Sequence, residues 1–151
     1  MRPWAPALVL AALALAACAP KAPKGVDKEQ LDEAVSRAIG DPASCLLIAE
    51  QAGGRQVYRY NNHMACARDL PACDQPGTRT LDQLLQATAK DGQPRMLSCN
   101  TSTDASRGVG WASGVLPTKH LVYAAMMEGP RAFPGRMMAD RLARAFAGVG
   151  L

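Results

Sequence analysis

Apolar residues recur three and four positions apart in three segments of the chain, a spacing that predicts helices. The segments cover residues 28–39, 81–91 and 135–147. The first two begin with residue pairs typical of a capping box, Asp27 with Gln30 and Thr80 with Gln83. We expect each helix to bury one apolar stripe. These stripes consist of Leu31, Ala34, Val35, Ala38 and Ile39, of Leu81, Leu84, Leu85 and Thr88, and of Met138, Leu142, Ala145 and Phe146.

Short apolar or alternating runs predict five strands. They lie at residues 45–49, 56–60, 95–101, 109–116 and 120–127. Gly53-Gly54 tolerates the positive φ of a tight hairpin turn between the first two, and the polar residues 61–79 are interpreted as loop. Strands grouped together with helices at both ends predict an α+β fold, a mostly antiparallel sheet of about five strands. We expect the helices at 28–39 and 135–147 to pack together on one face, with Trp111 largely buried.

The N-terminus has the three parts of an export signal. Arg2 is followed by an apolar stretch over residues 5–17, which is too short to span a bilayer comfortably. The stretch ends in Leu15-Ala16-Ala17-Cys18, which resembles a complete bacterial lipobox. That resemblance implies a signal peptide at 1–17 and lipidation of Cys18 by acyl chains such as palmitate. Two prolines, two lysines and a glycine follow Cys18 and predict a tether at 18–26, ahead of a single domain at 27–151. The alternative is an ordinary secretory signal followed by a chance cysteine.

Composition limits the remaining possibilities. A chain of 151 residues, 48% of them hydrophobic, suits one globular domain. The formal charge of +4 is small and spread along the chain, so it gives no reason to expect nucleic-acid binding. No second apolar stretch long enough for a membrane span follows the signal.

Four cysteines remain once Cys18 is assigned to the anchor, and an exported domain favours two disulfides. Three pairings are possible. Counting back from the hairpin turn places Cys45 opposite roughly Asn62, close to Cys66, which favours Cys45–Cys66 and leaves Cys73 with Cys99. The competing arrangement joins Cys66 to Cys73 and Cys45 to Cys99.

Other side chains suggest further chemistry. His63, Cys66, Cys73 and Cys99 have a spacing compatible with a zinc site, although an exported protein favours disulfides. His63 and His120 lie in separate segments, with no Ser or carboxylate selected as a catalytic partner. Met126-Met127 and Met137-Met138 are interpreted as core residues rather than soft-metal ligands. Four arginines are typical of the solvated face of an amphipathic helix, and would also suit contact with anionic lipid or peptidoglycan. They are Arg131, Arg136, Arg141 and Arg144.

The stretch Cys99-Asn100-Thr101 is followed by the strand that carries Trp111 and by the strand at 121–127. These segments resemble the late hairpin of penicillin-binding transpeptidases and serine β-lactamases, and residues 27–60 and 95–148 together resemble the α/β scaffold of that family. The catalytic motifs are missing. No serine after Cys18 has a lysine three positions on, and Cys99 and Thr101 replace the lysine and glycine of the family's Lys-Thr/Ser-Gly triad. The resemblance implies the scaffold without its catalytic equipment.

These observations predict a lipoprotein held at the periplasmic face of the outer membrane of a Gram-negative bacterium. No Asp follows Cys18, which in such lipoproteins favours the outer over the inner membrane. We expect a non-catalytic binding or envelope-assembly module with no cofactor and no bound metal. Its partners would be the membrane, through the anchor, and an envelope protein or peptidoglycan. The alternatives are a peptidoglycan-active or β-lactam-related enzyme of reduced size, and a metal-handling lipoprotein.

Overall fold

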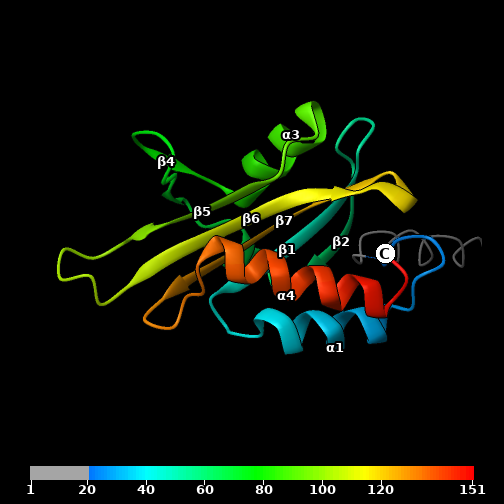
Figure 1. Ribbon diagram of the computed structural model, residues 1–151, viewed down its shortest axis with the longest axis horizontal. Helices are drawn as coiled ribbons and strands as arrows, with labels where there is room; N and C mark the ends of the chain where they lie inside the picture. The colour runs from blue at the N-terminus through cyan, green and yellow to red at the C-terminus, as the bar shows by residue number, and fades with distance from the viewer. Residues whose placement is uncertain (1–20) are drawn as a thin grey trace, which may run out of the picture.

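The centre of the molecule is a five-stranded antiparallel sheet in the order β2-β1-β7-β6-β5 (Figure 1). The computed structural model describes residues 21–151, so the expected signal peptide 1–17 and Cys18 lie outside the described residues. The predicted α+β fold is confirmed. The strands are β1 (Ser44–Glu50), β2 (Gln56–Tyr60), β5 (Arg95–Asn100), β6 (Gly108–Leu116) and β7 (Leu121–Gly129).

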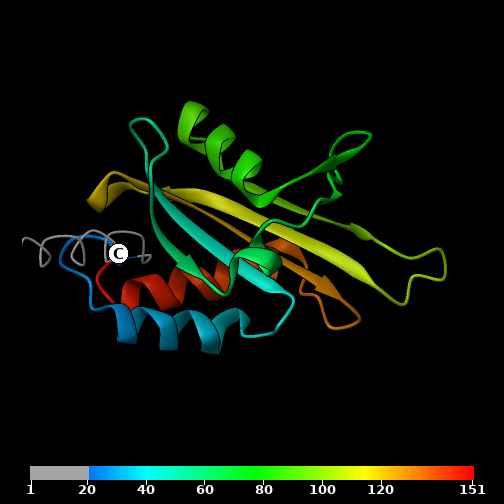
Figure 2. The ribbon, with the colours of Figure 1, turned by 180° about the vertical axis from the view of Figure 1, so that it is seen from behind.

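Helices cover both faces of this sheet. α1 (Lys28–Ile39) and α4 (Gly135–Gly148) lie side by side on one face, and α3 (Leu81–Asp91) lies on the other (Figures 1 and 2). The packing of the first and last helices together on one face is therefore confirmed. Both predicted capping residues also act as caps. The Asp27 carboxylate accepts a hydrogen bond from the Gln30 amide, and Thr80 forms a capping box with Gln83.

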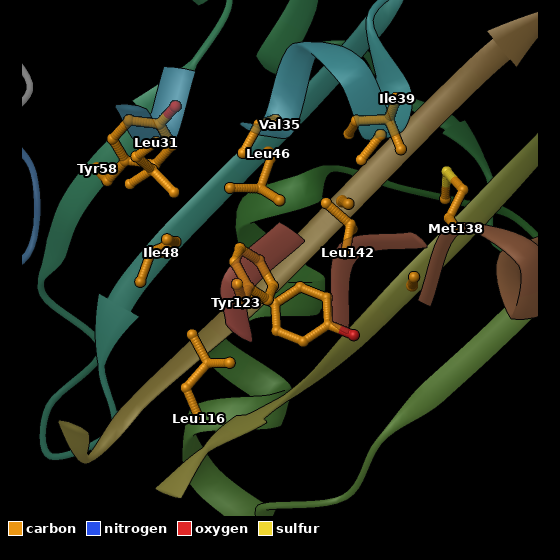
Figure 3. Packing of buried hydrophobic residues seen from close by; sticks show 14 of the residues in the cluster. Leu31, Val35, Ile39, Leu46, Ile48, Tyr58, Leu116, Tyr123, Met138 and Leu142 are labelled. Atoms are coloured by element: carbon orange, nitrogen blue, oxygen red, sulfur yellow. The ribbon is translucent and has the colours of Figure 1, made fainter. Parts of the chain in front are cut away.

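Two apolar clusters hold the layers together. β7 is buried at all nine of its positions, and its side chains alternate between the clusters. Figure 3 shows the first cluster, which joins Val35 of α1, Leu142 of α4 and Leu46 of β1. The second cluster lies between the sheet and α3 and contains Trp111 of β6, which is fully buried as expected.

Small residues let the start of α4 lie directly against the sheet. A Cβ atom on Gly135 would come within 2.2 Å of the Trp111 carbonyl oxygen, and one on Gly110 within 2.0 Å of the Phe133 carbonyl oxygen. Both positions therefore require glycine for a close backbone approach. This contact fixes where α4 begins and thus how it lies beside α1.

The segment over residues 61–79 contains more regular structure than the predicted loop. It forms the four-residue helix α2 (His63–Cys66) and a small two-stranded sheet of β3 (Leu70–Pro71) and β4 (Thr78–Arg79). These elements are too short to show a periodic apolar pattern, so sequence periodicity does not predict them. Asn62 caps α2, its side chain accepting the Ala65 amide.

Two disulfides attach this segment to the main sheet. Cys45 is bonded to Cys66 with a Cα–Cα distance of 5.2 Å, and Cys73 to Cys99 with a distance of 5.5 Å. This is the pairing that the sequence analysis favours over its competitor. The strand register pairs Leu46 with Tyr60, so Cys45 lies level with Asn61, one residue from the expected position.

The described part of the expected tether packs against the domain. Pro23 is buried, and Ala22 and Val26 pack against the cluster beneath α1 and α4. The Val26 amide also donates to the Pro23 carbonyl at 3.0 Å, which closes a turn before the helix. The domain therefore includes residues ahead of Asp27, where the predicted domain begins.

The long strands separate two ends of the molecule. Residues 21–27, the β6–β7 turn and the C-terminal Leu151 lie at one end of the long axis, and the β5–β6 hairpin lies at the other (Figures 1 and 2). β6 has nine residues, and a strand of that length spans about 30 Å. No helix within residues 21–151 has the length and hydropathy needed to cross a bilayer.

Replacing Trp111 with alanine should lower the free energy of unfolding by ~3–5 kcal/mol, because a fully buried indole would leave a cavity. The indole Nε1 also donates to the Pro71 carbonyl oxygen at 2.9 Å, a hydrogen bond that alanine cannot form. Urea unfolding followed by far-UV circular dichroism, with the disulfides intact, measures the change. Met137→Ala is the control, since Met137 is 43% exposed; equal decreases in both variants would contradict the assignment.

Candidate functional site

A groove of about 500 Å³ runs between α1 and α4 on the outer side of the helix pair. It is open because several residues at the helix junction are alanine or glycine, whose side chains leave space there. We call it the arginine groove. It is lined by Ala34, Arg37 and Ala38 of α1, by Arg141, Arg144, Ala145 and Gly148 of α4, and by Val149.

The arginine groove is positively charged. Three of the residues that line the groove are arginines, and no lining residue is acidic. Arg37 is partly compensated by Glu33, one helical turn earlier at 3.3 Å, in a pair exposed to solvent. Arg144 is exposed and forms no salt bridge within residues 21–151. The groove therefore offers guanidinium groups whose charge the protein itself leaves largely unbalanced.

Aromatic packing holds one of these guanidinium groups in place. The Arg141 Cζ atom lies 4.4 Å from the centre of the Phe133 ring, within cation–π distance. Phe133 precedes α4, in the segment held close to the sheet by Gly110 and Gly135. Stacking of this kind restricts the side chain before a ligand arrives, so less conformational entropy is lost on binding.

A second hollow of about 310 Å³ adjoins the arginine groove at Arg37, Ala38 and Arg141. Its far side carries Arg131, whose guanidinium lies 3.4 Å from the Asp41 carboxylate. The basic character thus continues past the C-terminal end of α1.

These groups suit binding rather than bond cleavage. A guanidinium presents N–H donors in a planar fork that matches a carboxylate or phosphate, and it remains protonated at all physiological pH values. It therefore acts poorly as a general base or nucleophile. The arrangement can recognise an anionic group, with the small residues of the helix junction providing the floor.

A separate ionic cluster surrounds Glu128, near the end of β7. This carboxylate is 5% exposed. It accepts two hydrogen bonds from Arg107 at 3.1 and 2.9 Å, one from Arg68 at 2.8 Å and one from Thr101 at 3.0 Å. Burial alone would raise the pKa of Glu128, but the hydrogen bonds from Arg107, Arg68 and Thr101 lower it to about 2.

The Glu128 cluster has a structural role. Its members come from the segment after α2, from the β5–β6 hairpin and from the end of β7, so one carboxylate ties three segments together. Four donors engage both carboxylate oxygens, which leaves little capacity to accept a proton from a substrate.

The residues considered for catalysis are dispersed. His63 begins α2, which is bonded to the first part of β1, whereas the His120 carbonyl accepts the Gln51 amide just beyond the other end of β1. Within residues 21–151, no serine hydroxyl hydrogen-bonds with a lysine or histidine side chain. The buried Ser113 hydroxyl instead receives a hydrogen bond from Thr88 at 2.7 Å. The geometry provides no activated serine.

The cysteines proposed as metal ligands are consumed by disulfides. Cys66 is bonded to Cys45, and Cys73 is bonded to Cys99, so none of them offers the thiolate that zinc requires. No cluster of three metal-binding side chains occurs in the described part of the chain. The zinc arrangement considered for His63 and these cysteines is therefore incompatible with this structure.

The methionine pairs pack mainly in the core. Met126 and Met127 are buried on opposite faces of β7, and Met138 is fully buried beneath α4. This confirms the interpretation of these three residues as core side chains. Met137 is exposed on α4, because it lies outside the apolar stripe that includes Met138, so its interpretation as a core residue is wrong.

Sequence reasoning identified only part of the arginine groove. Of the four arginines singled out near the C-terminus, Arg141 and Arg144 line it, Arg131 lines the adjoining hollow, and Arg136 lines neither. Arg37 was missed because its part in the groove depends on how α1 meets α4. Glu128 was also missed, although a carboxylate directly after the buried Met126-Met127 pair was a usable signal.

Comparison of the chain with protein families, with curated proteins and with solved structures finds no match. The site must therefore be interpreted from its own geometry.

Replacing Glu128 with glutamine should lower the free energy of unfolding by roughly 2–3 kcal/mol at neutral pH, because charged hydrogen bonds to a buried carboxylate are removed. The pKa of Glu128 is lowered from 4.5 to about 2 in the folded protein, so its contribution is present above pH ~4.5 and is lost as pH falls toward 2. Urea unfolding at pH 7 and pH 3 measures this. Glu33→Gln, at an exposed position, is the control. If the difference in the free energy of unfolding between the wild type and Glu128→Gln is the same at both pH values, the stabilisation does not come from the ionised Glu128 carboxylate.

Proposed function

We propose that the chain is a lipid-anchored protein of the periplasmic face of the outer membrane, serving as a non-catalytic binding module. Diacylglyceryl and acyl chains on Cys18 would attach it to the membrane, since each buried CH₂ group contributes ~0.8 kcal/mol. Support comes from the lipobox in the sequence. The two disulfides agree with an oxidising compartment outside the cytoplasm.

The arginine groove is the observation that carries the binding role. It joins three arginines on a floor of small residues and has no acidic lining residue. The ligand class that fits is a carboxylate- or phosphate-bearing envelope component, carried by peptidoglycan or by an envelope protein. Conventional catalytic pairs do not surround the groove in the described part of the chain, which favours recognition over turnover.

A relationship to penicillin-binding transpeptidases and serine β-lactamases is a second proposal. Its support is the element order, in which α1 and the β1–β2 hairpin open the domain and β5, β6, β7 and α4 close it. The position of the family's triad lysine holds Cys99, which is committed to a disulfide. A fluorescent penicillin distinguishes the two proposals, because covalent labelling of the purified protein would support a reduced enzyme over a binding module.

Changing Cys18 to serine should release the protein from membranes or leave it unprocessed, because the lipid-bearing sulfur is absent. Membrane flotation combined with intact-mass measurement tests this: the wild type should float and carry the added mass of acyl chains. Cys45→Ser with Cys66→Ser is a matched control that removes a disulfide but keeps Cys18. Processed Cys18→Ser protein that still floats would contradict the anchor.

Pyrophosphate at about ten times its dissociation constant should raise the melting temperature by about 5 °C relative to chloride at matched ionic strength. The Arg141→Gln/Arg144→Gln variant should lose most of this shift, because two groove guanidiniums are gone. Differential scanning fluorimetry measures the change in melting temperature. Arg136→Gln is the control on the same helix, since Arg136 lies outside the groove. Equal shifts in all three proteins would exclude the groove as the anion site.

A further inference from the structure

The packed N-terminal segment limits how far the domain can lie from its anchor. Ala22 packs against the core and Pro23 is buried. Four residue steps separate Cys18 from Ala22, and an extended chain of that length spans at most about 14 Å. A lipid on Cys18 would therefore hold this end of the domain at the membrane surface instead of letting it range freely.

Exposed lysines gather at the same end. Lys21 and Lys24 lie in the N-terminal segment, and Lys28 begins α1. Lys119 comes from the distant β6–β7 turn, yet its Nζ atom would lie only 4.0 Å from a Cβ atom on Gly25. Four of the five lysines in the sequence are thus placed around the point where the chain leaves toward Cys18.

Most neighbouring carboxylates are already engaged, whereas most of these lysines are not. Asp32 pairs with Lys28 at 2.6 Å, and the Asp27 carboxylate caps α1. Within residues 21–151, Lys21, Lys24 and Lys119 form no salt bridge. Three ammonium groups of this end are therefore left without a salt bridge to any described residue, and Glu29 is the acidic residue in the first turn of α1.

We propose that this end of the domain, formed by residues 21–25 and by the turn Pro117–Lys119, docks directly on the anionic phospholipid leaflet that holds the anchor. Lys21, Lys24 and Lys119 contact lipid phosphates. The proposal rests on the lipid anchor proposed above. It goes further by fixing the orientation: the β5–β6 hairpin and the Glu128 cluster face away from the membrane, one strand length of about 30 Å beyond the docked end.

Two observations favour the lipid leaflet as the partner of this end of the domain: the short chain to Cys18 and the positive charge of the lysines. The short span to Cys18 brings this end to the membrane in every orientation, so the leaflet is its nearest neighbour. Basic residues beside an anchor are attracted to anionic headgroups, and the attraction fades within a Debye length of about 10 Å at 0.1 M salt. The arginine groove is a separate surface between α1 and α4, and none of its lining residues belongs to the docked end.

The test uses the full lipidated protein reconstituted in vesicles of phosphatidylcholine alone or with 30% phosphatidylglycerol. Hydrogen exchange followed by mass spectrometry reports on amides in residues 21–25 and 117–120. We expect exchange there to slow at least fivefold in the anionic vesicles, and the slowing to disappear in 0.5 M NaCl. The Lys21→Gln/Lys24→Gln/Lys119→Gln variant should not show it, whereas Lys90→Gln, an exposed lysine on α3, should behave as the wild type.

The outcomes separate docking from anchoring. Protein that floats and carries lipid on Cys18, but exchanges equally in both vesicles, overturns the docking and leaves the anchor standing. Slowing that persists in the triple-lysine variant also overturns it, because the contact would then not depend on these charges. Protein that neither floats nor carries lipid overturns the anchor and the docking together.

Discussion

The central constraint in this structure is that β7 is buried on both faces along its whole length. Its alternating side chains enter two different clusters, so neither face of the sheet can be left to solvent. One helix covers one face, and two helices are needed to cover the other. Because α1 and α4 each turn one apolar stripe toward the sheet, the junction between them is left with polar and small residues. The arginine groove is a consequence of how the sheet is covered.

The residues between β2 and α3 are held by covalent and directional bonds more than by apolar burial. The two disulfides enclose sequence separations of 21 and 26 residues, which corresponds to about 3 kcal/mol of stabilisation each. Between them, the Trp111 indole donates to the Pro71 carbonyl, and Arg68 donates to Glu128. A segment that contributes only a few side chains to the core, among them Cys66 and Leu70, is thereby fixed against it.

The sequence was sufficient for elements whose pattern is local. The stripes of α1, α3 and α4 and the alternation along β6 are periodic, and the capping residues Asp27 and Thr80 mark helix starts. Features that depend on tertiary contacts could not be predicted from the sequence. Arg37 becomes part of a site only where α1 meets α4, and nothing in the sequence indicates that Pro23 is buried.

Several lysines and arginines of this molecule have different roles, and their chemistry explains the difference. Arg68 and Arg107 donate hydrogen bonds to the buried Glu128 carboxylate, and Arg141 stacks on the Phe133 ring. Both interactions suit a planar guanidinium. An ammonium is a compact, strongly hydrated charge that suits loose contact with many phosphates. If lysines hold the domain on the leaflet, α1 and α4, and the groove between them, run outward from the membrane together with the strands. The groove would then remain accessible to a ligand from the side.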